Sequence, residues 1–208
     1  MTGHTATPSG TGRIIPRTPA RTRRRGTALE DALLDAAWDE LREVGYAKLT
    51  MEGVAQRAGT SRPVLARRWS TRPQLVIAAL RRHRPMLSGE IPDTGNLRDD
   101  VLALLRRISA RLADLGPGTI YGLLGDYFAD PVLVPDLQAQ VLQTGNEVMA
   151  TILKRAAERG EARDDILPRV ATLPIDLLRH ELFRDLSPAG EHAITEIVDQ
   201  VFLPLVQR

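Results

Sequence analysis

The sequence predicts an all-α fold, with a small N-terminal unit of three helices followed by a larger helical unit. Three observations predict it. Apolar residues recur three and four positions apart over most of residues 27–206, which is the pattern of amphipathic helices. No alternating run bounded by turn residues indicates a strand. Glycine and proline clusters separate the apolar segments.

Composition excludes several classes of protein. The chain has 208 residues, enough for one large domain or two small ones. It has no cysteine, which excludes disulfides, thiolate metal sites and a thiol nucleophile. No stretch approaches the roughly 18 apolar residues of a membrane span, and the polar N-terminus lacks a signal core. We therefore expect a cytoplasmic protein with no membrane partner.

Charge is distributed unevenly along the chain. The formal net charge is only +2. Residues 1–84 nevertheless hold 16 basic against 7 acidic residues, whereas residues 85–208 hold 12 against 19. Such asymmetry indicates a segment that binds a polyanion, joined to a second unit with another role.

Residues 1–26 are predicted to form a disordered basic tail. They are rich in threonine, proline, glycine and arginine and contain no acidic residue. Their apolar content is too small to offset the entropy of ordering. The tail ends in a basic cluster directly before the first helix: Arg21, Arg23, Arg24 and Arg25.

Residues 27–72 are predicted to form a three-helix domain. The first helix begins at Thr27, where Glu30 completes a capping box, and ends at Gly45. The second covers residues 51–58 and is capped by Thr50. The third covers about 62–69, is capped by Ser61 and carries Pro63 in its first turn.

The second and third helices have the spacing of a helix-turn-helix. Ala55 is small enough for two helices to cross, and Gly59 tolerates the positive φ of the turn. Val54, Leu65 and Trp69 provide apolar anchors. The predicted outer face of the third helix is basic, as a helix that enters a DNA major groove requires: Arg62, Arg67 and Arg68.

Residues 73–208 are predicted to form the second, helical unit. A fourth helix runs to about residue 84. Five longer amphipathic segments follow at about 97–115, 118–129, 133–159, 168–184 and 188–206.

The segment from Leu33 to Leu75 resembles the DNA-binding domain of the tetracycline-repressor (TetR) family of bacterial regulators. It reads LLDAAWDELREVGYAKLTMEGVAQRAGTSRPVLARRWSTRPQL. The matching positions are Ala36, Ala37, Gly45, Tyr46, Thr50, Val54, Ala55, Ala58, Gly59, Ser61, Leu65, Trp69, Arg72 and Leu75.

The resemblance implies a set of DNA contacts. Thr50, Arg67 and Arg72 would lie at or near phosphates. The base edges would be met by Arg62, Pro63, Val64 and Arg67. The full predicted set is Thr50, Ser61, Arg62, Pro63, Val64, Arg67, Arg68, Arg72, Arg24 and Arg25. The tail arginines either reach a minor groove or have no role. For Arg81, Arg82 and Arg84 an ordinary solvated helix face is favoured.

The resemblance also implies a homodimer and an effector pocket in the C-terminal unit. Two apolar stripes suit a four-helix dimer interface or, equally, packing within one chain: Ile175, Leu178, Leu182, Ile194, Ile197, Val198 and Val201. Candidate pocket residues, each of which core packing would also explain, are Tyr121, Leu124, Tyr127, Phe128, Gln143, Asn146 and Met149.

We therefore expect a one-component transcriptional repressor, released from a palindromic operator on double-stranded DNA by an unidentified small-molecule effector. The alternative is a helical ligand-binding or scaffold protein with a degenerate DNA-binding domain. Its best support is Ala66, which stands where family members usually carry a tyrosine that touches a phosphate. A helical enzyme is poorly supported. His180 and Glu181 begin like a zinc-protease motif, but Arg184 replaces the second histidine. We expect no catalytic residue, metal or cofactor.

Overall fold

The computed structural model describes residues 26–83, 89–129 and 143–208, apart from the side chains of Gln143 and Thr144. Throughout these ranges the chain forms helices joined by turns, and a single isolated bridge pairs Ala162 with Gln207. The all-α prediction is confirmed. The predicted tail, including Arg24 and Arg25, lies outside the described residues, except for Gly26.

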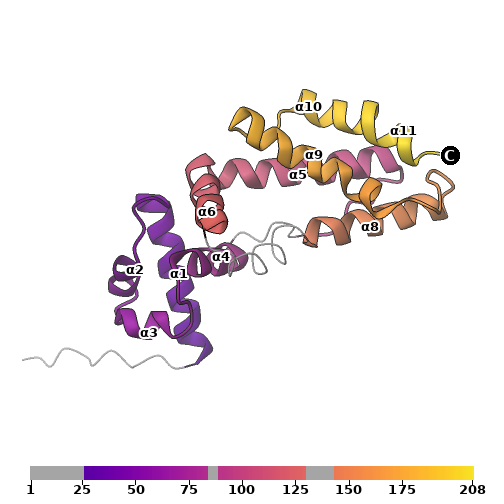
Figure 1. Cartoon of the computed structure of the whole chain (residues 1–208). Helices are drawn as coiled ribbons and strands as arrows, with labels where there is room; N and C mark the ends of the chain where they lie inside the picture. The colour runs from indigo at the N-terminus through magenta and orange to yellow at the C-terminus, as the bar shows by residue number, and fades with distance from the viewer. Residues whose placement is uncertain (1–25, 84–88, 130–142) are drawn as a thin grey trace, which may run out of the picture.

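Four helices build the N-terminal part (Figure 1). They are α1 (Thr27–Val44), α2 (Met51–Arg57), α3 (Arg62–Ala66) and α4 (Arg72–His83). Buried apolar side chains from all four form one core, to which α1 contributes Leu33 and Ala37, α3 contributes Leu65 and α4 contributes Leu75. Because Leu75 and the apolar face of α4 belong to this core, it extends past the predicted boundary after residue 72.

Two local predictions in this part are wrong. Gly26, not Thr27, is the N-cap of α1, and no side chain caps the helix. Glu30 is directed elsewhere, with a carboxylate oxygen 4.0 Å from the Arg68 guanidinium. The third helix is also shorter than expected, because the amides of both Arg68 and Trp69 bond to the carbonyl of Leu65 and tighten the chain into a turn.

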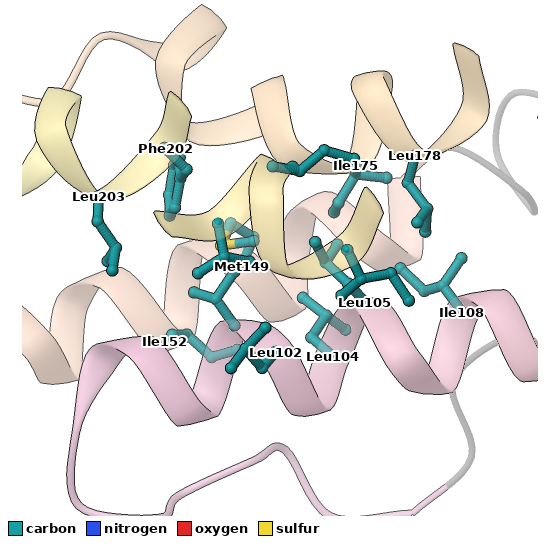
Figure 2. Close-up of a cluster of buried hydrophobic side chains, with 14 of the residues drawn as sticks. Leu102, Leu104, Leu105, Ile108, Met149, Ile152, Ile175, Leu178, Phe202 and Leu203 are labelled. Carbon is teal, nitrogen blue, oxygen red and sulfur yellow. The ribbon is translucent and has the colours of Figure 1, made fainter. Parts of the chain in front are cut away.

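The C-terminal part is a second bundle. Its elements are α5 (Leu97–Leu115), α6 (Pro117–Ala129), α8 (Gln143–Glu158), α9 (Pro168–Asp185), α10 (Glu191–Glu196), the π-helix η3 (Ile197–Phe202) and α11 (Leu203–Val206). Figure 2 shows its core, in which side chains of α5, α8 and α9 meet those of η3 and α11. The labelled members are Leu102, Leu104, Leu105, Ile108, Met149, Ile152, Ile175, Leu178, Phe202 and Leu203.

The apolar stripes predicted for a dimer interface are mostly internal. Six of the seven residues are buried within one chain: Ile175, Leu178, Leu182, Ile194, Ile197 and Val198. Only Val201 is exposed, at 36%. Packing within one chain, the alternative to a dimer interface, therefore explains these six residues. The prediction that they face a partner subunit is wrong.

Polar contacts hold the beginning of α5 against the end of α8. The fully buried carboxylate of Asp100 accepts hydrogen bonds from the amide and hydroxyl of Thr94, at 2.6 and 2.9 Å. Glu161 accepts a 2.5 Å hydrogen bond from the amide of Leu97 and pairs with Arg159. The contact with Leu97 satisfies a helix-end donor that would otherwise lack a partner. Across the described ranges, no helix has the length and apolar character that crossing a membrane requires.

Candidate nucleic-acid interface

The helix-turn-helix predicted from residue spacing is present. Val54, Ala55 and Leu65 are buried where α2 and α3 pack. Between the helices Gly59 has φ +65°, and the amide of Thr60 donates to the carbonyl of Ala55 at 2.9 Å. A residue with a side chain is strained at that φ, so glycine fits this turn best.

The outward face of α3 and the turn after it carry the predicted contact residues. Arg62, Pro63, Arg67 and Arg68 are exposed, and Val64 is partly exposed. Ala66 is exposed among them, so no aromatic ring covers this face. The face is therefore short, basic and open to solvent, as a major-groove reader requires.

The arginines of α3 and of the turn after it have few carboxylate partners within the protein. Arg62 lies 2.8 Å from Glu52, but both side chains are more than 60% exposed, and such surface pairs contribute little. Among the residues that the structure describes, no carboxylate lies within ion-pair distance of Arg67. Arg57 differs, because it pairs with Glu40 and Glu43 at 2.7 and 2.5 Å.

Two hydroxyl groups lie at the N-cap positions of α2 and α3. The hydroxyl of Thr50 accepts a 3.0 Å hydrogen bond from the amide of Gly53, so its predicted capping of α2 is confirmed. A hydroxyl that accepts still has a proton to donate. Ser61 occupies the N-cap position of α3, but its side chain makes no capping bond, so that detail of the prediction is wrong.

Two arginines of α4, Arg72 and Arg82, pair with carboxylates of the protein. Arg82 pairs with Asp31 and Asp35 at 2.7 and 3.0 Å, consistent with a solvated helix face. Arg72, a predicted phosphate contact, points toward α6, where its guanidinium lies 2.7 Å from Asp126. Asp126 was not among the predicted residues, and its signal in the sequence is a carboxylate within the otherwise apolar segment 120–129.

The candidate effector-pocket residues do not line one described cavity. Met149 is fully buried in the C-terminal core, and Tyr121 donates its hydroxyl to the carbonyl of Leu182 at 2.9 Å. Tyr127 contacts Phe128 edge to face, and Phe128 is 75% exposed. These positions indicate packing or surface roles.

The remaining candidates leave one observation that points to a ligand. Leu124 packs against the C-terminal core, and the side chain of Gln143 lies outside the described residues. Asn146 has a buried Oδ1 with no hydrogen-bond partner among the described residues. A cavity of about 330 Å³ lies elsewhere, and its lining shares no residue with the predicted set: Trp38, Leu41, Arg42, Gly45, Asp114, Leu115 and Thr119.

Among the described residues, no three histidine or carboxylate side chains are grouped so that they could hold a metal ion. The candidate interface presents arginine and hydroxyl groups on a helix-turn-helix. These groups are donors, which suits the phosphates and base edges of nucleic acid.

Comparison with known proteins agrees with this geometry. The family model described as "Bacterial regulatory proteins, tetR family" matches residues 33–79, and "Tetracyclin repressor-like, C-terminal domain" matches residues 91–201. The chain is 30% identical over 184 residues to the DNA-binding transcriptional repressor TetR of Mycobacteroides abscessus, covering 88% of this chain and 96% of that protein.

Two further similarities extend over most of the chain. An uncharacterised HTH-type transcriptional regulator of Mycobacterium tuberculosis is 31% identical over 183 residues, 86% of this chain and 88% of the relative. The crystal structure of the TetR family transcription regulator SCO0332 superposes with a TM-score of 0.68 at 25% identity, covering 86% of this chain and 99% of that one. The chain is therefore a DNA-binding transcriptional regulator and belongs to the TetR family.

Proposed function

We propose that the protein represses transcription as a homodimer that binds a palindromic operator through the outer face of α3. The observation that carries the proposal is the exposed guanidinium of Arg67, which has no carboxylate within ion-pair distance among the described residues. An arginine without an internal partner is available to pair bidentately with guanine. Arg62 and Arg68 are exposed as well, and the hydroxyl of Thr50 at the N-cap of α2 is a further donor.

The test compares Arg67→Glu with Arg81→Glu, a matched control. Both arginines are exposed, but Arg81 lies near the end of α4, away from α3. Duplexes selected from a random pool by the wild-type protein serve as the operator. Removing one base-pairing side chain costs about 1–3 kcal/mol, so two half-sites predict a loss of roughly thirtyfold or more for Arg67→Glu. Arg81→Glu is expected to retain most of the affinity.

Two results would contradict the proposal. Near-wild-type affinity in Arg67→Glu would show that α3 does not read the operator. Failure of the wild-type protein to select any sequence, even with competitor DNA removed, would favour the scaffold alternative. A circular-dichroism spectrum of each variant checks that the helices remain.

For the dimer, we propose an interface formed by α9, η3 and α11. Phe183, Val201 and Leu205 are 36–48% exposed on elements that pack together in one chain. Exposed apolar side chains grouped on a surface indicate an interface. Phe183→Glu is expected to shift the protein to a monomer in light scattering, whereas Phe128→Glu, at another exposed phenylalanine on α6, is expected to remain dimeric.

For the effector, we propose a binding site that includes Asn146. Its buried Oδ1 has no hydrogen-bond partner among the described residues, so a ligand donor would satisfy it. Screening small molecules by thermal shift against the wild type and Asn146→Leu tests this. A stabilising ligand that acts equally on both proteins would exclude Asn146. We place the protein in the cytoplasm because a bacterial regulator acts where its operator DNA lies.

A further inference from the structure

Helix α6 makes a close polar and apolar contact with the N-terminal part. Figure 1 shows α6 between the N-terminal helices and the bundle of α5, α8 and α9. Leu123 of α6 is buried in the N-terminal core rather than in the core of the C-terminal bundle. One turn of α6 therefore belongs, by packing, to the part of the chain that carries the helix-turn-helix.

Gly122 allows this approach. A Cβ atom added to Gly122 would lie within 3.0 Å of two atoms of the Tyr46 ring, which real Cβ atoms do not tolerate. Tyr46 itself is only 2% exposed and lies in the segment between α1 and α2. Any side chain at position 122 would push α6 and this segment apart.

Three polar groups close the same contact. The hydroxyl of Tyr46 donates to Oδ2 of Asp126 at 2.6 Å, and Nη2 of Arg72 donates to the same oxygen at 2.7 Å. The Arg72 guanidinium also lies 4.4 Å from the centroid of the Tyr46 ring, within cation–π distance. We call Tyr46, Arg72 and Asp126 the joint triad.

The protonation states of the joint triad reinforce one another. Burial opposes ionisation of Asp126, but the hydrogen bonds from Arg72 and Tyr46 prevail and hold its pKa below the usual range. Burial and the hydrogen bond to Asp126 raise the pKa of the Tyr46 hydroxyl well above its usual range. Near neutral pH, Tyr46 and Arg72 are therefore both donors and Asp126 is a charged acceptor, a strong combination.

A cavity is lined by residues from both parts of the chain. The cavity of about 330 Å³ is lined by Trp38 and Gly45 at the end of α1 and by Leu115 and Thr119 at the α5–α6 turn. Among the described elements, the main helix contact between the two parts is that of α4 with α6. The contacts of Gly122, Leu123 and Asp126 therefore carry much of the task of orienting one part on the other.

We infer that the joint triad is a positioning device that fixes the angle of the helix-turn-helix on the C-terminal bundle and thereby sets which operator half-site spacing the dimer accepts. The inference rests on the proposed function. In a symmetric dimer the two recognition helices must lie about one DNA turn apart, or a multiple of it. A rigid joint makes that distance selective, and a loosened joint makes it tolerant.

The test measures affinity against spacer length. The selected operator is remade with one or two base pairs inserted or removed at its centre, each of which moves the half-sites by about 3.4 Å per base pair. Wild-type protein is expected to lose affinity steeply with either change. In Asp126→Asn, the ratio between the best spacer and its neighbours is expected to fall at least tenfold.

A matched control separates the joint from a general loss of ion pairs. Asp199 holds Arg98 by two hydrogen bonds of 2.7 and 2.8 Å, but entirely within the C-terminal bundle. Asp199→Asn removes a comparable charge and is expected to keep the wild-type spacer profile.

A second pair of variants tests the joint from the other side. Gly122→Ala forces a methyl group against Tyr46, whereas Gly125→Ala in the same helix meets nothing within 4 Å. Both changes favour the helical state of α6 by up to about 1 kcal/mol, so neither melts the helix. Gly122→Ala is expected to broaden the spacer profile as Asp126→Asn does, and Gly125→Ala is expected to leave it sharp.

The outcomes distinguish this inference from the function on which it rests. If folded Asp126→Asn and Gly122→Ala both retain the sharp wild-type profile, the joint triad does not set spacing. If the wild type selects no DNA, the proposed function fails and this inference fails with it. A profile broadened equally by Asp199→Asn would also overturn the inference, since the effect would not be specific to the joint.

Discussion

Thr50 offers a way to separate what one side chain does for the fold from what it does for DNA. Its hydroxyl accepts a 3.0 Å hydrogen bond from the amide of Gly53 and retains a proton to donate. Alanine removes both functions. Asparagine keeps an acceptor for the cap and a donor for a phosphate, whereas aspartate keeps only the acceptor and adds a negative charge.

The expected magnitudes follow from these groups. Loss of the cap in Thr50→Ala costs about 1 kcal/mol, which lowers the melting temperature by about 2–4 °C in a chain of this size. Loss of the hydrogen bond to a phosphate costs about 1 kcal/mol in each protomer, or roughly thirtyfold in affinity for the dimer. Thr50→Asp is expected to melt like the wild type and to bind DNA more weakly than Thr50→Ala, because its carboxylate repels phosphate.

The assay is a thermal melt and a gel-shift titration on the selected operator for all three variants. Thr151→Ala serves as a control, because that hydroxyl donates to the carbonyl of Glu147 within its own helix. The reasoning is refuted if stability and affinity fall in the same order across the series. Equal DNA affinity for Thr50→Asp and Thr50→Asn would show that the hydroxyl does not face a phosphate.

Three further results are expected. Phe202→Ala removes a fully buried ring and should lower the free energy of unfolding in urea by roughly 3–5 kcal/mol. Phe128→Ala removes an exposed ring and should change that free energy by less than about 0.5 kcal/mol. Similar losses in both variants would contradict the described core. The hydrogen bonds from Arg159 and from the amide of Leu97 lower the pKa of Glu161, so its contribution to stability is present above about pH 4.5 and is lost as the pH falls through the lowered value. Urea unfolding of the wild type should therefore depend more steeply on pH in acid than that of Glu161→Gln, and parallel curves would exclude this contribution. Removing residues 1–26 should flatten the dependence of operator affinity on salt, by a slope of about 0.9 for each phosphate that the tail had neutralised, whereas an unchanged slope would mean that Arg24 and Arg25 do not touch DNA.

The helix-turn-helix was predictable because its determinants are local. Thr50 caps α2 three residues from its partner amide, and Gly59 meets the demand of a single turn. The beginning and end of α5 likewise agree with the residues predicted from apolar spacing. In each case the relevant atoms lie within a few positions in the sequence, where residue type alone specifies geometry.

The joint triad and the proposed dimer face were not predictable for the opposite reason. Asp126 meets Tyr46 and Arg72 across 80 and 54 residues, and no local pattern records which carboxylate an arginine meets. An apolar stripe such as that of Ile175 and Leu178 shows that a helix buries one face, but not whether its own chain or a partner covers it. Tertiary packing decides both questions.

The distribution of tryptophan in this protein has a practical consequence. Its two tryptophans both lie in the N-terminal part: Trp38 lines the cavity and stacks on His83 with ring centroids 5.5 Å apart, and Trp69 follows the recognition helix. The C-terminal bundle has none. Intrinsic fluorescence excited at the indole band therefore reports on the N-terminal part and on the cavity that Trp38 lines with α5 and α6. An emission change on adding a compound that binds the bundle away from this cavity would be an optical signal of communication between the two parts.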